Sequence, residues 1–191
     1  MNKERVFEIL RETNALLEGH FKLSSGKHSN KYLQCARVLQ FPTHARILGK
    51  LLGQRFSDMN IDGVIAPAIG GIIIAHEVAG ALGVRAIFGE RNEGRMSLRR
   101  GFQISRGERF LVIEDVITTG KSTREIIELL YSFEGILAGV CAIADRSNSA
   151  LNLPCHPESL VQLDVSNWDP DECPLCKANY PLTTPGSRFL K

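Results

Sequence analysis

An α/β fold with a central, mostly parallel sheet flanked by helices is the fold class that this sequence predicts. Short apolar runs of strand length alternate with longer segments whose apolar residues recur at helical spacing. This alternation is typical of a parallel sheet that helices cover on both faces. At 191 residues, without an internal repeat or a low-complexity tract, the chain suits one domain with a sizeable core.

The expected elements follow in order along the chain. Residues 3–17 have the spacing of an amphipathic helix ending near Gly19, and residues 19–34 have the polar, turn-rich pattern of a hairpin or short-strand lobe. The remaining predictions are helices over 42–56, from 71 to about 82 and over 122–133, and strands over 61–66, 84–88, 110–113, 137–144 and 159–165.

Three peripheral parts are expected within the single domain over residues 1–191. They are hood elements at about 19–40, a C-terminal tail at about 150–191, and an arginine-rich segment at about 89–107. The last has little apolar periodicity, so it predicts a long mobile loop or a hairpin. A loop of this length is uncommon in a domain unless it serves a function or is disordered.

The overall charge argues against nucleic-acid or membrane partners, since 23 basic and 21 acidic residues give a formal net charge of +2. Charges interrupt the first ten residues, and no apolar run approaches the length of a membrane span. A cytoplasmic location is therefore expected. The basic bias is local and concentrated in Arg91, Arg95, Arg99, Arg100, Arg106 and Arg109.

The most informative segment is Arg109-Phe-Leu-Val-Ile-Glu-Asp-Val-Ile-Thr-Thr-Gly-Lys-Ser-Thr123. An apolar strand ends in the adjacent acids Glu114 and Asp115, and a Thr/Gly/Ser-rich turn then opens a helix. Unpaired amides at a helix start bind phosphate, and carboxylates accept hydrogen bonds from vicinal hydroxyls. A phosphorylated ribose would satisfy both halves of this pattern.

A nucleotide-triphosphate P-loop is excluded, because it needs a glycine where this chain has Asp115. The segment instead closely resembles the phosphoribosyl-diphosphate signature of the type I phosphoribosyltransferases. The resemblance implies that family's fold and assigns the ribose hydroxyls to Glu114 and Asp115. It also places the loop that binds phosphoribosyl diphosphate, including its 5-phosphate, at Val116, Ile117, Thr118, Thr119, Gly120, Lys121 and Ser122.

A second glycine turn, Pro67-Ala-Ile-Gly-Gly71, also joins a strand to a helix. Taken alone, such a turn is more often a tight connection than a ligand site. Beside the phosphoribosyl signature, the better interpretation is that its backbone amides bind pyrophosphate. The residues assigned to that role are Ala68, Ile69, Gly70 and Gly71.

The N-terminal lobe indicates the subfamily. Phe21-Lys-Leu-Ser-Ser-Gly-Lys-His-Ser-Asn-Lys-Tyr32 resembles a segment of the orotate phosphoribosyltransferase family, and the closing Cys-Pro-Leu-Cys and Thr-Pro-Gly-Ser-Arg resemble its short-loop branch associated with thermophiles. This family makes orotidine 5′-phosphate and pyrophosphate from orotate and phosphoribosyl diphosphate, with Mg²⁺, in pyrimidine (UMP) synthesis. The resemblance implies orotate contacts from Thr118, Arg146, Ser24, Lys27 and Tyr32.

Arg146 has a physical reason for this role, since a guanidinium can bind a planar carboxylate with two parallel hydrogen bonds. A surface ion pair with Asp145 or another nearby acid is the alternative for this arginine.

The arginine-rich segment departs from the pattern of many family members, which have lysines and a histidine there. Arg91 and Arg95 are assigned to pyrophosphate, and Arg91 is counted with Glu114 and Asp115 among the catalytic residues. A solvated basic hairpin without a specific role is the alternative. Resemblance alone implies a homodimer in which the loop is shared across the interface. It assigns no side chain as a direct magnesium ligand.

Five cysteines make an odd number, which is a poor pattern for a disulfide framework. Cys173 and Cys176 have the spacing of half a zinc site, and Cys155 with His156 could supply the remainder. A local disulfide or redox pair, and thiols that only pack or lie on the surface, stay open as alternatives.

Two further hypotheses about function are retained. The first is a phosphoribosyltransferase for another nucleobase, such as a purine, xanthine or uracil. The second is a regulator that senses phosphoribosyl diphosphate without turning it over, although the sequence contains no evident nucleic-acid-binding module or basic stripe.

Overall fold

The structure is a computed structural model that describes residues 3–23, 25–147 and 151–185. Its strands are β1 (Leu16–Lys22), β2 (His28–Leu33), β3 (Gly63–Pro67), β4 (Arg85–Asn92), β5 (Arg95–Leu98), β6 (Arg109–Ile117), β7 (Ile136–Asp145), β8 (Glu158–Gln162) and β9 (Asn167–Trp168). Its α-helices are α1 (Lys3–Glu12), α2 (Ala36–Leu39), α3 (Pro42–Gly53), α4 (Gly71–Leu82), α5 (Lys121–Ser132) and α6 (Pro174–Lys177). Short 3-10 helices occupy Gln54–Phe56 and Pro170–Glu172.

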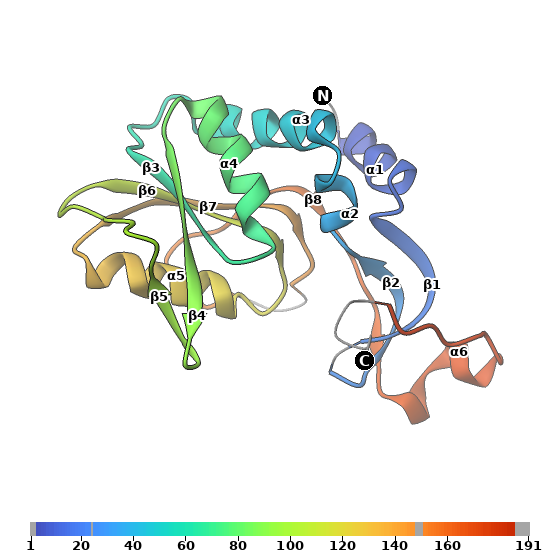
Figure 1. Cartoon of the computed structure of the whole chain (residues 1–191). Helices are drawn as coiled ribbons and strands as arrows, with labels where there is room; N and C mark the ends of the chain where they lie inside the picture. Colours follow the sequence, from blue (N-terminus) through green and yellow to red (C-terminus); the bar gives the residue numbers. More distant parts are fainter. Residues whose placement is uncertain (1–2, 24, 148–150, 186–191) are drawn as a thin grey trace.

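The strands form two sheets. The larger is six-stranded with the order β5-β4-β3-β6-β7-β8, and its pairs are parallel except β4 with the edge strand β5. The smaller is antiparallel with the order β1-β2-β9, and it lies to one side of the large sheet (Figure 1). The predicted α/β fold with a mostly parallel central sheet is confirmed.

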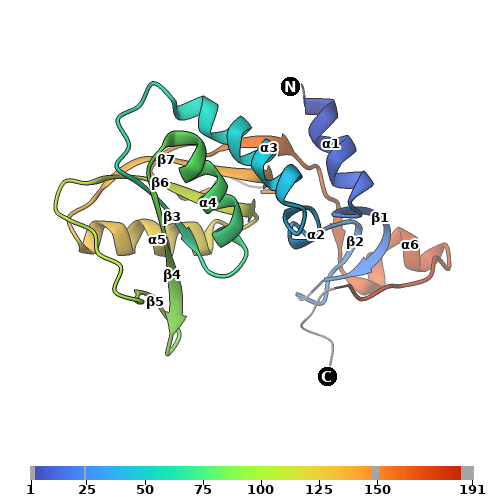
Figure 2. The same cartoon turned by 45° about the horizontal axis from the view of Figure 1, so that its top comes forward.

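Helices cover both faces of the large sheet, with α3 and α4 on one face and α5 on the other (Figures 1 and 2). Alternate residues of a strand point to opposite faces, and the core divides accordingly. On β3, Val64 and Ala66 pack into the cluster under α3 and α4, whereas Ile65 packs into the cluster under α5. Each fully buried aliphatic side chain of this kind contributes about 1.5–3 kcal/mol.

The sheet reverses its winding between β3 and β6. These strands pair in parallel, yet the chain leaves β3 through α4 toward β4 on one side and leaves β6 through α5 toward β7 on the other. Helices α4 and α5 therefore begin at the same edge of the sheet but on opposite faces. In open α/β sheets, ligands bind at such a topological switch point.

The first helix is shorter than predicted. It ends at Glu12, and Leu16 and Gly19 belong to strand β1. Asn14 takes a left-handed conformation with φ 52°, which terminates the helix, and the amide of Ala15 then bonds to the carbonyl of Leu10. The apolar pair after the turn fits a helix or a strand equally well, so spacing alone placed it wrongly.

The segment expected to be a mobile loop or a hairpin contains a hairpin. Strand β4 extends beyond the predicted 84–88, and Asn92 pairs with Arg95 across a two-residue turn. Both turn residues, Glu93 and Gly94, have positive φ, as the favoured two-residue hairpin turns require.

Helices α3 and α4 pack closely at Gly49, where an added Cβ would lie 2.5 Å from the Cβ of Glu77 and 2.8 Å from its carbonyl carbon. Gly49→Ala should therefore lower the free energy of unfolding by about 1–3 kcal/mol, because one helix must shift. Urea denaturation followed by circular dichroism measures the change.

Gly80→Ala on α4 is the matched control. Nothing lies within 4 Å of its added Cβ, so alanine should raise stability by about 0.5–1 kcal/mol through its higher helix propensity. Equal unfolding midpoints for the two variants would contradict the proposed close approach of the helices.

Candidate functional site

The two motif turns meet at the switch point. The sequence predicted a strand that ends at residue 113, before the two acids. Strand β6 instead extends to Ile117, so Glu114 and Asp115 lie within it. The glycine turn after β3 contacts them, since a Cβ on Gly70 would lie 2.8 Å from Asp115 Oδ2. A side chain at position 70 would therefore displace the Asp115 carboxyl group, so the close approach of the two turns favours glycine there.

The loop after β6 leads directly into helix α5. Gly120 has φ 68°, a conformation that glycine adopts without steric cost, and α5 begins at Lys121 with no acidic side chain in its first turn. Thr118 and Thr119 are exposed to solvent. Backbone amides at the helix start, the helix dipole and exposed hydroxyls together make this loop able to bind an anion, although the amide of Lys121 donates to the hydroxyl of Thr119 (3.4 Å).

The turn after β3 is arranged similarly. Helix α4 begins at Gly71, again without an acidic residue in its first turn. The peptide bond between Ala68 and Ile69 is cis, and the Ile69 side chain is 85% exposed. The amide of Ala68 donates to the carbonyl of Gly89 (2.7 Å), so this turn is joined to the base of the β4–β5 hairpin.

The two acids share a poorly solvated environment. Glu114 is 8% exposed, and burial together with the neighbouring Asp115 carboxylate raises the pKa of Glu114 to about 9. Burial also raises the pKa of Asp115, although the amide of Val116 donates to its Oδ1 (2.8 Å) and opposes that rise. At neutral pH Glu114 is therefore mainly protonated and can both donate and accept hydrogen bonds.

Cys35 was not predicted at this site. It is fully buried, and its thiol lies 3.8 Å from the carbonyl oxygen of Asp115. Burial, followed by the charges of Asp115 and Glu114, raises the pKa of the Cys35 thiol well above its ordinary value. Cys35 therefore stays a neutral packing group beneath the acids, and no motif in the sequence indicated this contact.

Arg146 follows strand β7 at the same edge of the sheet. Its Nε is buried and has no hydrogen-bond partner among the described residues. Burial of the guanidinium lowers the pKa of Arg146, and an electrostatic interaction with Tyr32 partly offsets that decrease. Asp145 instead accepts from the amide of Ser147 (2.8 Å), and the described residues contain no ion pair of Arg146 with an acid. The surface ion pair considered for Arg146 is therefore not formed.

The remaining residues assigned to orotate differ in placement. Tyr32 lies on β2, half-buried, and its hydroxyl donates to Gln34 Oε1 (2.7 Å). Lys27 is exposed and pairs with Asp169 (3.3 Å), a residue of the C-terminal segment. Ser24 lies outside the described residues.

The arginines of the hairpin are partly engaged with the protein itself. Arg91 forms an ion pair with Glu125 on α5 and also donates to the carbonyl of Gly94 (3.3 Å), and Arg100 pairs with Glu90 (2.9 Å). Arg95, at the start of β5, is exposed. The pair between Arg91 and Glu125 links the hairpin to helix α5.

The predicted partners of the cysteine pair are wrong. Cys155 packs with Leu151 and Leu153 against the core cluster under α5, and His156 is exposed. The side chains that lie with Cys173 and Cys176 are instead His20 and His28. Spacing could not indicate this, because the histidines belong to the N-terminal hairpin and approach the cysteines only in the folded chain.

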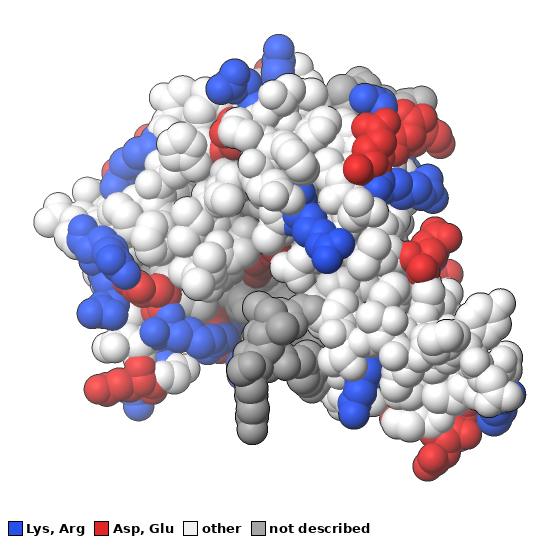
Figure 3. Space-filling view, turned by 45° about the vertical axis from the view of Figure 1, so that its right-hand side comes forward, with Lys and Arg blue, Asp and Glu red and all other residues white. Residues whose placement is uncertain are grey.

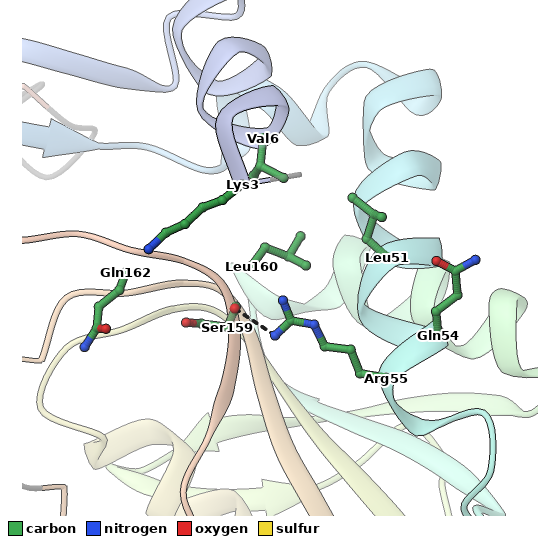
Figure 4. Close-up of a pocket in the computed structure, with 8 residues that line it drawn as sticks. All are labelled: Lys3, Val6, Leu51, Gln54, Arg55, Ser159, Leu160 and Gln162. Atoms are coloured by element: carbon green, nitrogen blue, oxygen red, sulfur yellow. Dashed lines mark hydrogen bonds between the residues drawn. The ribbon is translucent and has the colours of Figure 1, made fainter. Parts of the chain in front are cut away.

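A separate hollow of about 470 Å³ lies between α1, α3 and β8 (Figure 4). Arg55 crosses it and donates to the carbonyl of Ser159 (2.8 Å). None of the predicted site residues contributes to its lining, so we do not assign it to the site at the switch point.

Comparison with known proteins decides the family. A model of the phosphoribosyl transferase domain matches residues 35–171. The orotate phosphoribosyltransferase of Caldanaerobacter subterraneus subsp. tengcongensis is 51% identical over 190 residues, which is 100% of both chains. The chain belongs to the orotate phosphoribosyltransferase family.

Two further relatives agree with this assignment. The orotate phosphoribosyltransferase of Desulforamulus reducens is 50% identical over 190 residues, again 100% of both chains. The crystal structure of orotate phosphoribosyltransferase from Aeropyrum pernix matches with a TM-score of 0.69 and 25% identity, covering 82% of this chain and 92% of that one. The family fold implied by the sequence resemblance is confirmed.

Within the described ranges, no helix has the length and apolar character that a membrane-crossing segment needs.

The buried acid pair gives the protein a pH-dependent stability. Below about pH 4.5 Glu114 is protonated in both the folded and the unfolded chain, and between about 4.5 and 9 only the folded chain keeps the proton. The contribution of Glu114 to stability therefore falls as the pH rises through this window. Glu114→Gln, which cannot ionise, should be more stable than the wild type at pH 8.5 by on the order of a few kcal/mol.

Thermal unfolding at a series of pH values measures this difference, which should vanish near pH 4.5. Glu128→Gln on the exposed surface of α5 is the control and should follow the wild-type curve. Parallel curves for Glu114→Gln and the wild type would show that Glu114 is not held protonated.

Proposed function

We propose that this protein transfers the 5-phosphoribosyl group from phosphoribosyl diphosphate to orotate, giving orotidine 5′-phosphate and pyrophosphate, in pyrimidine (UMP) biosynthesis. The observation that carries the proposal is the buried Nε of Arg146, without a partner among the described residues, at the sheet edge that also bears the paired acids. Relatives of about 50% identity over the whole chain have the matching name and support it.

For phosphoribosyl diphosphate, the proposal divides the switch point into two parts. Residues 118–122 bind the 5-phosphate at the start of α5, Val116 and Ile117 lead into this loop, and Glu114 and Asp115 bind the ribose hydroxyls. The turn over residues 68–71 binds pyrophosphate at the start of α4. The contact between Gly70 and Asp115 supports this division, because pyrophosphate and ribose are adjacent in the substrate.

For orotate, Arg146 binds the carboxylate, and Tyr32 and Thr118 line the base. An anion would supply the hydrogen-bond acceptor and the charge that the buried guanidinium lacks. Lys27 remains in the proposal as a polar contact. Its ion pair with Asp169 is exposed, so breaking that pair costs about 1 kcal/mol or less.

In the reaction, a ring nitrogen of orotate loses its proton to solvent and bonds to ribose C1. The bond from C1 to pyrophosphate breaks, and pyrophosphate leaves with that electron pair. Positive charge develops on the sugar and negative charge on the leaving group. The carboxyl oxygens of Asp115 stabilise the first, and the amides of residues 68–71 stabilise the second. Arg91 and Arg95 act electrostatically, since an arginine stays protonated at neutral pH and is a poor proton donor.

Mg²⁺ is part of the proposal. Asp115 lies at the sheet edge where the ion would act, and carboxylate oxygens suit a hard cation, but no side chain is assigned as a direct ligand. When bound, the ion would neutralise charge on the pyrophosphate.

The resemblance also supports a homodimer in which the hairpin is shared across the interface. Residues 1–191 are proposed to form a single functional domain. The cytoplasmic location is retained because five cysteines, an odd number, are a poor pattern for the disulfide framework of a secreted protein.

A phosphoribosyl-diphosphate-sensing regulator is the less favoured alternative. On the face shown in Figure 3, acidic and basic side chains alternate around the rim, and no basic stripe crosses the described residues. That face offers no surface of the kind that binds a nucleic-acid backbone.

The base specificity is tested with orotate, uracil, hypoxanthine and xanthine, each given with phosphoribosyl diphosphate and magnesium. We expect conversion of orotate alone, because the other bases lack the carboxylate that Arg146 would bind. Orotate absorbance and product chromatography measure the conversion. Turnover of another base would leave the phosphate site intact but overturn the base pocket, and binding without any turnover would favour the regulator.

Arg146→Ala should lower kcat/KM for orotate about 100-fold or more, as expected for loss of a charge-assisted hydrogen-bonded pair. Arg146→Lys should recover only part of this, since lysine cannot form the paired contact. Steady-state kinetics measure both variants.

Calorimetric titration of each Arg146 variant with phosphoribosyl diphosphate and magnesium shows whether the rest of the site is folded. The affinity of each variant for phosphoribosyl diphosphate should differ from that of the wild type by less than about threefold. Unchanged orotate kinetics in Arg146→Ala would contradict the assignment.

A further inference from the structure

Two histidines and two cysteines meet far from the switch point. Their candidate ligand atoms are His20 Nε2, His28 Nδ1 and the Sγ atoms of Cys173 and Cys176, and all lie within 4.8 Å of one another. No other group of metal-ligand side chains was found among the described residues. The proposed transfer reaction does not use any of these four residues.

The spacing of these atoms matches the edges of a tetrahedron around a zinc ion. Zn–S bonds of about 2.3 Å and Zn–N bonds of about 2.0 Å place neighbouring ligand atoms about 3.3–3.8 Å apart. The separation of the two histidine nitrogens is 3.0 Å, and His20 Nε2 lies 3.5 Å from Cys173 Sγ and 3.7 Å from Cys176 Sγ. His28 Nδ1 lies 3.2 Å from Cys176 Sγ. These four separations differ from the tetrahedral values by no more than a few tenths of an ångström, and the other pairs of ligand atoms lie within 4.8 Å of each other.

The orientation of His20 is already fixed for metal binding. Its Nδ1 lies 2.9 Å from the carbonyl oxygen of Tyr180, which can only accept, so Nδ1 carries the proton. The lone pair of the neutral ring is then on Nε2, the atom that faces the other three ligands. A backbone carbonyl that orients a histidine in this way is the usual second-shell partner of a metal ligand.

The burial and the total charge of the four candidate ligands are also suitable for a zinc site. His20 is 3% exposed, His28 4% and Cys173 0%, and Cys176 is half-buried. Two thiolates and two neutral imidazoles around Zn²⁺ have no net charge, so the complex can be buried without leaving an unpaired charge. Without a metal, the four candidate ligand atoms would lie against one another in this buried position.

The fold brings the ligands together through several independent contacts. A bulge in β1 between Glu18 and Phe21 allows the consecutive residues His20 and Phe21 both to be buried. His28 begins β2 and pairs with Trp168 of β9, the strand that leads to Cys173. Thr183 lies along the opposite edge of the hairpin, where its amide donates to the carbonyl of His20 (2.8 Å).

We propose that His20, His28, Cys173 and Cys176 form a tetrahedral structural zinc site that fastens the C-terminal segment to the β1–β2 hairpin. All four positions are occupied by protein atoms, which is typical of structural and not catalytic zinc. Figures 1 and 2 show α6 beside β1 and β2, which places the site between the first 33 residues and the last part of the chain.

The site would also stabilise one wall of the proposed base pocket. His28 and Tyr32 are on the same short strand, and Lys27 directly precedes it. A zinc ion at the start of β2 would limit movement of this strand relative to the C-terminal segment. The zinc proposal itself does not depend on the base or the reaction.

The test measures zinc by atomic emission in protein purified without added metal and dialysed against a weak chelator. We expect about one zinc per chain in the wild type. Cys176→Ser should lose most of it, whereas Cys155→Ser, the matched control in the core cluster under α5, should retain it. Cys176 is chosen because it is the least buried of the four ligands, so its replacement by serine should disturb folding least.

Two measurements on the wild type keep the test valid if the variant fails to fold. Cobalt added to metal-free protein should give the intense visible bands of a tetrahedral site together with a thiolate charge-transfer band. Removal of zinc should lower Tm by at least about 5 °C, with recovery on adding zinc sulfate.

Wild-type protein that contains no zinc and takes up none would overturn the proposal. So would iron in place of zinc, a disulfide between Cys173 and Cys176 in freshly purified protein, or full zinc content in Cys176→Ser. None of these measurements requires catalytic activity, so failure of the proposed transfer reaction would be seen separately.

Discussion

The parallel pairing of β3 with β6 is the constraint on which the rest of the structure depends. The chain diverges from this pair, so α4 and α5 begin at the same sheet edge on opposite faces. The first amides of both helices therefore lie at the same edge of the sheet, although their two motifs are far apart in the sequence. The small contact between Gly70 and Asp115 follows directly from this geometry, and a larger residue at position 70 would separate the two halves.

The acids at this crevice are costly for the folded protein. Glu114 and Asp115 are adjacent and poorly solvated, and burial raises the pKa of both. A protein that needed only stability would gain from an apolar residue at either position. Their retention in a buried strand is explained if a bound ribose supplies hydrogen-bond donors and the reacting sugar supplies positive charge, as the proposed function requires.

The N-terminal hairpin presents a different physical problem. Strands β1 and β2 belong to a small antiparallel sheet completed only by the two-residue strand β9, and such a sheet has little core of its own. The C-terminal segment contacts both edges of the β1–β2 hairpin. Trp168 pairs with β2 on one edge, and Thr183 bonds to β1 on the other. The cluster of histidines and cysteines lies between these contacts, where a cross-link would have most effect on the position of Tyr32.

The alternating elements of the large sheet could be predicted from the sequence, and so could the strand, turn and helix start within residues 109–123, because both depend on local periodicity and on residues close together in the chain. The sequence did not determine where β1 begins, since Leu16 and Leu17 fit a helix or a strand, or that β6 includes the two acids. Only the tertiary structure decided the partners of distant side chains. It left Arg146 Nε unpaired, placed Cys155 in the core, and brought His20 and His28 to Cys173 and Cys176. Contacts across some 150 residues arise from packing and strand pairing, and no local pattern encodes them.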